Sequence, residues 1–153
     1  MPIAVVGLSH RTSPVEIRER LAFAGPVIPQ ALANLRAEGV ADEAVIVSTC
    51  NRVEIYAASP AEPAQTLAAL KRFLLKFHRF DGGLDEALYA YAEPESLTHL
   101  FRVVAGLDSM VLGETEILGQ VKQAYELARG GQHTGRCLNK AFQRAFNVAK
   151  QIR

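Results

Sequence analysis

Short apolar runs alternate with helical patterns along the first part of the chain. The apolar runs are bounded by polar or turn-forming residues, which is typical of strands, and they cover residues 3–8, 44–47, 53–57 and 87–91. Between them, apolar residues recur at helical spacing, with prolines near the starts and glycine or a turn near the ends. These patterns predict helices over residues 15–21, 26–38 and 60–77.

The predicted order is strand, helices, strand, strand, helix, strand. This is the βαββαβ pattern of a ferredoxin-like sandwich, in which helices cover one face of an antiparallel sheet. The remaining pattern is wholly helical, with helices expected over residues 94–107, 114–129 and 134–153. We therefore predict an α+β fold, with a ferredoxin-like subdomain over residues 1–92 and a helical subdomain over residues 93–153 that packs on it.

Apolar residues keep helical spacing up to the end of the chain, and no glycine or proline interrupts them. We therefore expect the last helix to be the start of a longer one. No apolar segment is long enough to span a bilayer, and the first residues lack the positive charge of a signal peptide. These features predict a protein without a membrane partner.

The formal net charge is +1, which indicates neither nucleic acid nor a membrane as the partner. The two cysteines, Cys50 and Cys137, lie far apart, and this fits a reducing cytoplasm better than a disulfide framework. The four histidines and two cysteines lack ligand spacing, so we expect no metal site. No glycine fingerprint for a nucleotide phosphate is found, so we expect no cofactor-binding residues in this chain.

The connection between two predicted strands, residues 48–52, carries the densest chemistry. Cys50 offers a nucleophilic thiol, and Thr49 and Asn51 flank it with a hydroxyl and an amide. Arg52 could stabilise a thiolate, or it could grip a substrate carboxylate with its two-pronged donor geometry. A free cysteine is also often a small buried apolar residue, so a structural role for Cys50 stays open at this point.

The predicted helix over residues 94–107 contains His99. Its expected apolar stripe consists of Leu97, Leu100, Phe101, Val104 and Leu107. His99 falls well away from that stripe, so it is either exposed to solvent or turned into a cleft as a general acid or base.

Residues 106–120 form a second polar constellation. Ser109 lies between two glycines, and Glu114 and Glu116 open the next predicted helix. Acids in a first helical turn favour the helix dipole, but they could equally hold a substrate amino group. Gln120, one or two turns further, could orient a polar ligand.

Together these stretches closely resemble the glutamyl-tRNA reductase family. The resemblance is carried by residues 7–14, 16–20, 48–56, His99, 106–110 and 112–122. Its most specific elements are Ser-Thr-Cys-Asn-Arg at 48–52 and Leu-Gly-Glu-x-x-Ile-Leu-Gly-Gln at 112–120. The match spans nearly the whole chain.

The resemblance implies a reaction in tetrapyrrole biosynthesis. Cys50 would attack the ester of glutamyl-tRNA to give a thioester, which NADPH would reduce to glutamate-1-semialdehyde. His99 resembles the active-site histidine near the nucleophile, and Arg52 would take the substrate side-chain carboxylate. The glutamate pocket would be lined by Thr49, Asn51, Ser109, Glu114, Thr115, Glu116 and Gln120.

The resemblance also implies that this family's NADPH-binding and dimerisation domains follow the catalytic domain and are not in this chain. A homodimer would then form outside these residues. Two other functions stay open: a non-catalytic module that binds tRNA or a partner, and a thiol-dependent esterase that acts alone.

Overall fold

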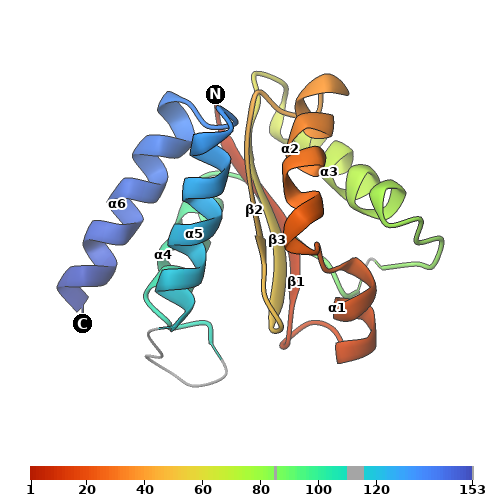
Figure 1. Cartoon of the computed structure of the whole chain (residues 1–153), viewed down its shortest axis with the longest axis horizontal. Helices are drawn as coiled ribbons and strands as arrows, with labels where there is room; N and C mark the ends of the chain where they lie inside the picture. The colour runs from red at the N-terminus through yellow and green to blue at the C-terminus, as the bar shows by residue number, and fades with distance from the viewer. Residues whose placement is uncertain (85, 110–115, 153) are drawn as a thin grey trace.

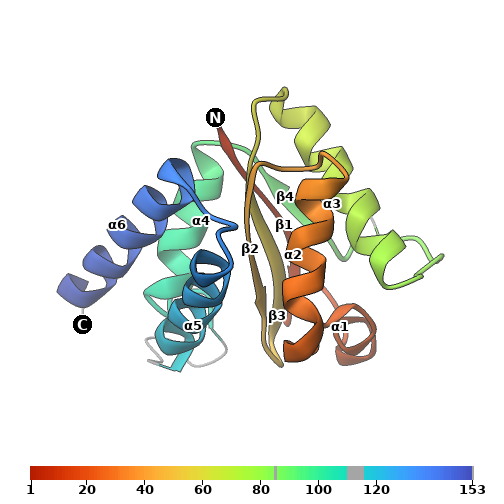
Figure 2. The ribbon, with the colours of Figure 1, turned by 45° about the horizontal axis from the view of Figure 1, so that its top comes forward.

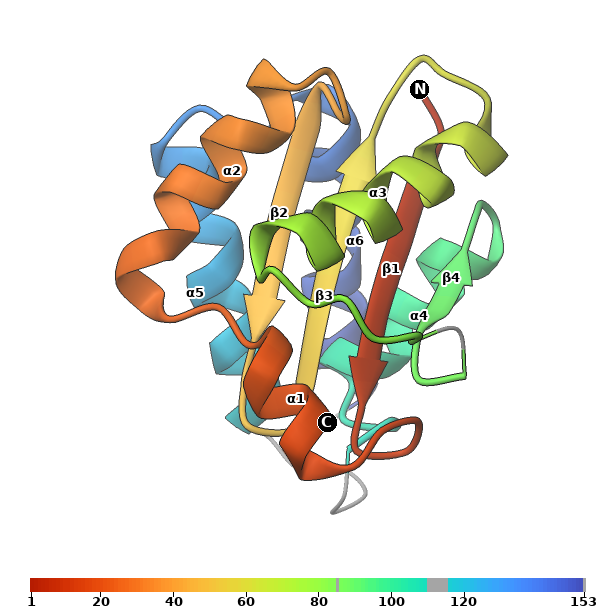
Figure 3. The same ribbon diagram turned by 90° about the vertical axis from the view of Figure 1, so that its right-hand side faces the viewer.

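The computed structural model describes residues 1–84, 86–109 and 116–152. In these residues one four-stranded sheet has the order β2-β3-β1-β4, and every neighbouring pair is antiparallel (Figure 3). The strands are β1 (Ile3–Ser9), β2 (Glu43–Ser48), β3 (Arg52–Ala58) and β4 (Tyr89–Tyr91). This is the strand order of a ferredoxin-like sandwich, so the predicted α+β fold is confirmed.

Helices cover both faces of the sheet (Figures 1 and 2). One face carries α1 (Val15–Leu21), the 3₁₀ helix η1 (Gly25–Val27), α2 (Ile28–Ala37) and α3 (Pro63–Phe77). The other carries α4 (Glu95–Val104), α5 (Glu116–Gly130) and α6 (Arg136–Ile152). No helix in the described part of the chain is long and apolar enough to cross a membrane. A division into separate subdomains at residue 92 stays a prediction.

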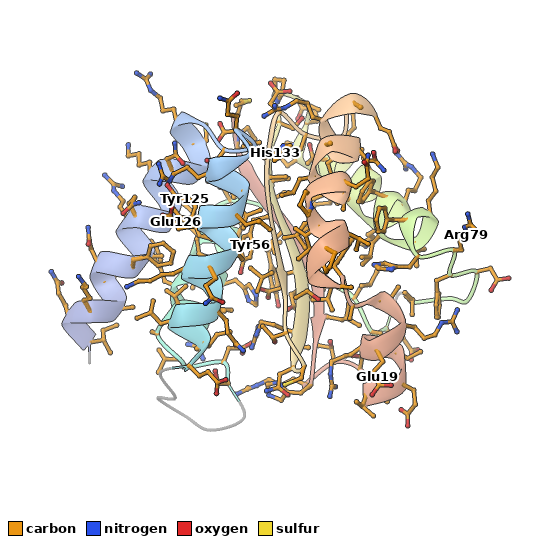
Figure 4. All side chains as sticks on the ribbon, viewed as in Figure 1. Glu19, Tyr56, Arg79, Tyr125, Glu126 and His133 are labelled. Atoms are coloured by element: carbon orange, nitrogen blue, oxygen red, sulfur yellow. The ribbon has the colours of Figure 1, made fainter. Side chains whose placement is uncertain are left out.

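This arrangement explains why the central strands are nearly continuous apolar runs. All residues of β1 and β3 are buried, because each face of the sheet is covered by helices. On β3 the side chains alternate, with Val53 and Ile55 on one face and Arg52, Glu54 and Tyr56 on the other. Tyr56 lies edge-on to Phe142 of α6, with ring centroids 5.4 Å apart. Figure 4 shows Tyr56 on the side of the sheet that faces α5 and α6. The polar face of β3 is therefore the face covered by α4, α5 and α6.

The orientation of α4 differs from the sequence expectation. Its buried residues are Ser96, Leu100, Val103 and Val104, whereas Leu97 is only half-buried. The Ser96 hydroxyl donates a hydrogen bond to the Ile3 carbonyl over 2.7 Å, which holds this helix against β1. The residue of a helix that lies nearest the sheet can thus be small and polar. The spacing of apolar residues alone does not identify such a position.

Glu43, at the start of β2, connects the sheet to the first turn of α6. Its Oε1 accepts hydrogen bonds from the backbone N–H groups of Gly135 (2.7 Å) and Leu138 (2.8 Å). Its Oε2 accepts one from Cys137 over 3.3 Å. The first N–H groups of a helix have no partner within the helix, and a carboxylate there also favours the helix dipole. Glu43 therefore caps α6 from a distant part of the chain.

We predict that Glu43→Ala lowers the free energy of unfolding by about 1–3 kcal/mol, because it removes the cap and leaves buried N–H groups without a partner. The matched control is Glu38→Ala, since the Glu38 carboxylate pairs at the surface with the exposed Lys76 over 3.6 Å. We expect its effect to stay within about 0.5 kcal/mol. Urea denaturation followed by circular dichroism measures both values, and equal losses would contradict the capping role.

Candidate active site

The loop between β2 and β3 is held by the hydroxyl of Thr49. Its Oγ1 accepts hydrogen bonds from the backbone N–H groups of Asn51 (3.1 Å) and Arg52 (3.2 Å). The Thr49 N–H in turn donates to the Arg52 carbonyl over 2.8 Å. This turn closes tightly and leaves the Cys50 side chain exposed at its tip.

Two neighbouring segments brace the same loop. Arg18 of α1 donates from Nε to the Cys50 carbonyl over 3.3 Å and from Nη1 to the Ser13 carbonyl over 2.6 Å. The backbone N–H of His10 donates to the Asn51 carbonyl over 2.9 Å. The position of the Cys50 backbone is therefore set by contacts from β1's end and from α1, as well as by its own turn.

Arg52 leaves this loop and points into the interior, where it is only 1% exposed. Its Nη1 donates to Glu54 Oε2 over 3.2 Å. Its Nη2 donates both to the Asp108 carbonyl (2.7 Å) and to Asp108 Oδ2 (3.1 Å). Burial alone lowers the pKa of Arg52, but the negative charge of Glu54, followed by Tyr89 and Asp108, raises it above its ordinary value.

Glu54 is the fully buried centre of the polar side chains on this face. Its Oε2 is contacted by Arg52 Nη1 (3.2 Å), the Tyr89 hydroxyl (2.5 Å) and His99 Nε2 (2.5 Å). Its Oε1 accepts from the Tyr56 hydroxyl over 2.8 Å. Burial by itself raises the pKa of Glu54, but the hydrogen bond and charge of His99, then Arg52, outweigh it and hold the pKa at about 2. The carboxylate is thus ionised throughout the physiological pH range.

Gly7 provides the space for this cluster. It lies opposite Glu54 in the β1–β3 pairing and opposite Tyr89 in the β1–β4 pairing. The Glu54–Tyr89 hydrogen bond therefore passes over Gly7. A Cβ atom at this position would lie 2.5 Å from the Val53 carbonyl oxygen and 2.8 Å from Glu54 Cγ. Only glycine leaves room for the carboxylate to reach across β1.

His99 projects from α4 into this cluster. Its side chain is 11% exposed, and its ring packs against both Tyr89 and Tyr91, with centroid distances of 5.0 and 5.2 Å, while these two tyrosine rings stack on each other. Because the buried face of α4 includes Ser96 and Val103, His99 faces the sheet and not the solvent. The sequence left His99 either exposed to solvent or turned into a cleft, and in the structure it lies against the sheet in a buried polar cluster.

The two polar constellations of the sequence meet in the fold. Arg52 of the first contacts Asp108, which directly precedes Ser109 of the second. Thr49 and Gln120 line one cavity of about 400 Å³ between the end of β2 and α5. Glu116 is exposed at the start of α5. The predicted pocket residues Glu114 and Thr115 lie outside the described residues.

Several members of the cluster were not singled out by the sequence interpretation. Glu54, Tyr89 and Asp108 belong to this group, and so does His10, whose buried Nδ1 has no hydrogen-bond partner among the described residues. Burial, then Arg52 and Arg11, lower the pKa of His10. One available signal was the alternation of Arg52, Glu54 and Tyr56 along an otherwise apolar strand, which places two charges on one buried face.

The described residues contain no group of three or more histidine, cysteine or acidic side chains that could hold a metal ion. What they do contain is an exposed thiol on a hydrogen-bonded turn, next to a buried network of His99, Glu54 and Arg52. An exposed thiol on a fixed turn and a largely buried histidine are side chains that enzymes with a cysteine nucleophile use, and they make this region the candidate active site.

The comparisons with known proteins agree with this class of site. The sequence profile described as "Glutamyl-tRNAGlu reductase, N-terminal domain" matches residues 6–153, so the chain belongs to this family. Curated glutamyl-tRNA reductases from Marinobacter nauticus and Stenotrophomonas maltophilia are 46% and 50% identical to it over its whole length. The solved structure of glutamyl-tRNA reductase from Methanopyrus kandleri matches with a TM-score of 0.81 and 30% identity, covering 98% of this chain.

The chain spans about a third of the length of these relatives: 35% of the Marinobacter protein, 34% of the Stenotrophomonas protein and 34% of the Methanopyrus chain. The similarity therefore concerns one part of a longer type of protein.

The low pKa of Glu54 predicts a pH-dependent stability. Its pKa is about 2 in the folded chain, below the ordinary value of 4.5. The stability that the ionised carboxylate contributes is therefore present above about pH 4.5 and is lost as the pH falls towards 2, by on the order of 3 kcal/mol. Urea denaturation at a series of pH values measures this loss.

In the Glu54→Gln variant this part of the pH dependence should disappear. The matched control is Glu126→Gln, because Glu126 pairs with Arg129 at the surface of α5. We expect the control to follow the unmodified protein across the same pH range. An unchanged acid profile for Glu54→Gln would show that the carboxylate is not ionised by its partners.

The exposures of the two thiols predict their relative reactivity. Cys50 is exposed on its turn, whereas Cys137 is half-buried in the first turn of α6 and packs against the core. We expect limited alkylation with iodoacetamide, followed by peptide mass spectrometry, to label Cys50 first. Cys50→Ser and Cys137→Ser variants assign the labelled peptides, and faster labelling of Cys137 would contradict this prediction.

Proposed function

We propose that this chain is the catalytic domain of a glutamyl-tRNA reductase, which transfers the glutamyl group from its tRNA to Cys50. The observation that carries the proposal is the exposed Cys50 thiol, held on a braced turn in a chain that belongs to this family. The buried cluster behind the turn supplies fixed charges close to the strand that carries the nucleophile.

In the proposed step, the Cys50 sulfur attacks the carbonyl carbon of the glutamyl ester. The C–S bond forms, the bond from that carbon to the ribose oxygen breaks, and the thiol proton is passed to the departing oxygen. The products are a Cys50 thioester and uncharged tRNA, so atoms and charges balance. His99 is the proposed proton carrier, since an imidazole can accept and donate a proton near neutral pH.

The proposed glutamate pocket combines the two polar constellations. Thr49 and Gln120 line the same cavity, and this supports their place in the glutamate pocket. Asn51, Ser109 and Glu116 are proposed as further residues of this pocket. For Glu114 and Thr115 the proposal rests on the family resemblance.

The substrate carboxylate can contact Arg52, as proposed, only if one of the present partners of the guanidinium moves away. The guanidinium is buried and already donates to Glu54 and Asp108. The Asp108 side chain is 17% exposed and lies on the outer side of the guanidinium. A substrate carboxylate that binds Arg52 therefore has to compete with Asp108, and we propose that Asp108 yields this position.

NADPH supplies the hydride that reduces the thioester to the aldehyde. In residues 1–84, 86–109 and 116–152 the strands pair only in antiparallel fashion, so these residues do not form the parallel β-α-β unit that binds dinucleotides. The proposal places the NADPH site and the contacts of a homodimer in other parts of the protein, and the protein in the cytoplasm.

The two competing functions make different predictions. A non-catalytic tRNA-binding module would leave Cys50 inert, whereas its exposure favours chemistry. A thiol esterase that acts alone would hydrolyse acyl groups as its normal product. In either enzyme, Arg52 favours an acidic acyl group only if Asp108 yields its place on the guanidinium.

We predict that the purified chain removes glutamate from glutamyl-tRNA but forms no aldehyde, with or without NADPH. If no hydride donor is bound nearby, water is the only group that can attack the thioester at Cys50. The measurement follows tRNA deacylation and aldehyde formation in parallel. Cys50→Ser should abolish deacylation, while Cys137→Ser serves as the matched control and should retain it.

Aldehyde formation by this chain would show that its residues suffice for hydride transfer. Deacylation that persists in Cys50→Ser would overturn the proposed nucleophile. If the unmodified chain does not deacylate the tRNA, trapping of a radiolabelled glutamyl adduct on the full-length protein decides the matter, because the proposed mechanism requires that adduct on Cys50.

A further inference from the structure

We propose that Glu54 is a positioning residue, which holds His99 through its Nε2 atom and thereby makes Nδ1 the ring nitrogen that exchanges protons with the reacting groups. This inference rests on the proposed function, because it assigns an atom to the proton transfer there. It is carried by the hydrogen bonds of one buried carboxylate.

The contacts of Glu54 determine which group holds the protons. Arg52 can only donate, and it contacts Oε2 over 3.2 Å. The Tyr89 hydroxyl and His99 Nε2 reach the same oxygen, each over 2.5 Å. An oxygen approached by a guanidinium and two further groups has no room for a proton of its own. The carboxylate is therefore an acceptor, and His99 Nε2 must carry a hydrogen.

This assignment leaves Nδ1 as the only ring nitrogen that can change its protonation state without breaking the contact with Glu54. When the imidazole is neutral, its single proton stays on Nε2 and Nδ1 has a free lone pair. When the ring accepts the proton of an attacking thiol, that proton goes to Nδ1, and the same atom returns it to the departing ribose oxygen. Glu54 itself neither gains nor loses a proton in this sequence.

The surroundings also oppose rotation of the ring. His99 is 11% exposed, and its ring packs against the stacked rings of Tyr89 and Tyr91. A ring flip would remove the Nε2–H from Glu54 Oε2 and leave a fully buried carboxylate with one donor fewer. Loss of a partner from a buried charge is costly, so one tautomer and one ring orientation are strongly favoured.

The same carboxylate joins the histidine to the nucleophile loop. Glu54 contacts Arg52, and the backbone of Arg52 closes the turn that carries Cys50. His99 comes from α4 on one face of the sheet, and the turn comes from the connection of two strands at its end (Figure 1). A single side chain thus fixes the ring relative to the strand that presents the thiol.

The test is the ¹⁵N–¹H NMR spectrum of the His99 side chain in the purified chain, at a pH where the imidazole is neutral. We expect the Nε2–H tautomer alone in the unmodified protein. In Glu54→Gln the acceptor charge is lost, and we expect a mixture of the two tautomers. This readout needs no substrate, so it stays informative if the proposed function fails.

The matched control is Tyr56→Phe, which removes a hydrogen bond from the same carboxylate but at Oε1, the oxygen that His99 does not contact. We expect this variant to lose stability and to keep the Nε2–H tautomer. A change that reflects only general damage to the cluster would appear in both variants, and that result would overturn the proposal.

The second readout is deacylation of glutamyl-tRNA. We expect Glu54→Gln to lower its rate about twofold or more, in proportion to the share of His99 that leaves the Nε2–H tautomer. An Nδ1–H tautomer in the unmodified protein overturns the proposal, and this result requires no variant to fold. A changed tautomer in Glu54→Gln with an unchanged deacylation rate also overturns it, because Nδ1 would then not exchange the proton.

Discussion

The structure depends on one ionised carboxylate that lies between the sheet and its second layer of helices. An unpaired charge at the fully buried position of Glu54 would be very costly, because the interior cannot replace the water around it. Hydrogen bonds from its own strand β3, from β4 on the far side of β1, and from α4 replace that water. These donors converge only if α4 crosses this face of the sheet with His99 turned inward. The electrostatic requirement of one residue therefore specifies how the helical layer docks.

Glu43 is a second carboxylate of the sheet that binds the layer of helices formed by α4, α5 and α6. Glu43 caps the first turn of α6, and the loop before this helix is also held by hydrogen bonds from β2 and α2. Each acidic residue belongs to the sheet, and each binds a helix that lies far from it in the sequence. The apolar core provides most of the driving force for packing, but it is non-directional. Directional hydrogen bonds to buried carboxylates supply the specific orientation.

The functional site divides into an exposed part and a buried part. The thiol lies on a turn whose backbone groups are satisfied locally and by neighbouring segments, so it can be exposed without loss of order. The charged groups behind it are shielded from water, where their interactions are stronger. Arg52 belongs to both parts, since its backbone closes the turn and its side chain enters the buried network. For the proposed reaction, such a division would let a large substrate reach the thiol while the charges behind it stay fixed.

The sequence by itself determined the elements of this fold. Apolar runs and helical spacing predicted four strands in the right order, because local periodicity reports which side of an element is buried. The motif around Cys50 also indicated the family, to which the chain belongs, and suggested the thiol that we propose as nucleophile. Only the tertiary structure showed that Arg52 is buried against Glu54 and Asp108, and that Ser96 turns His99 towards the sheet. These contacts join residues from separate elements, and their energies depend on burial and distance. Neither quantity is encoded in the local pattern of apolar and polar residues.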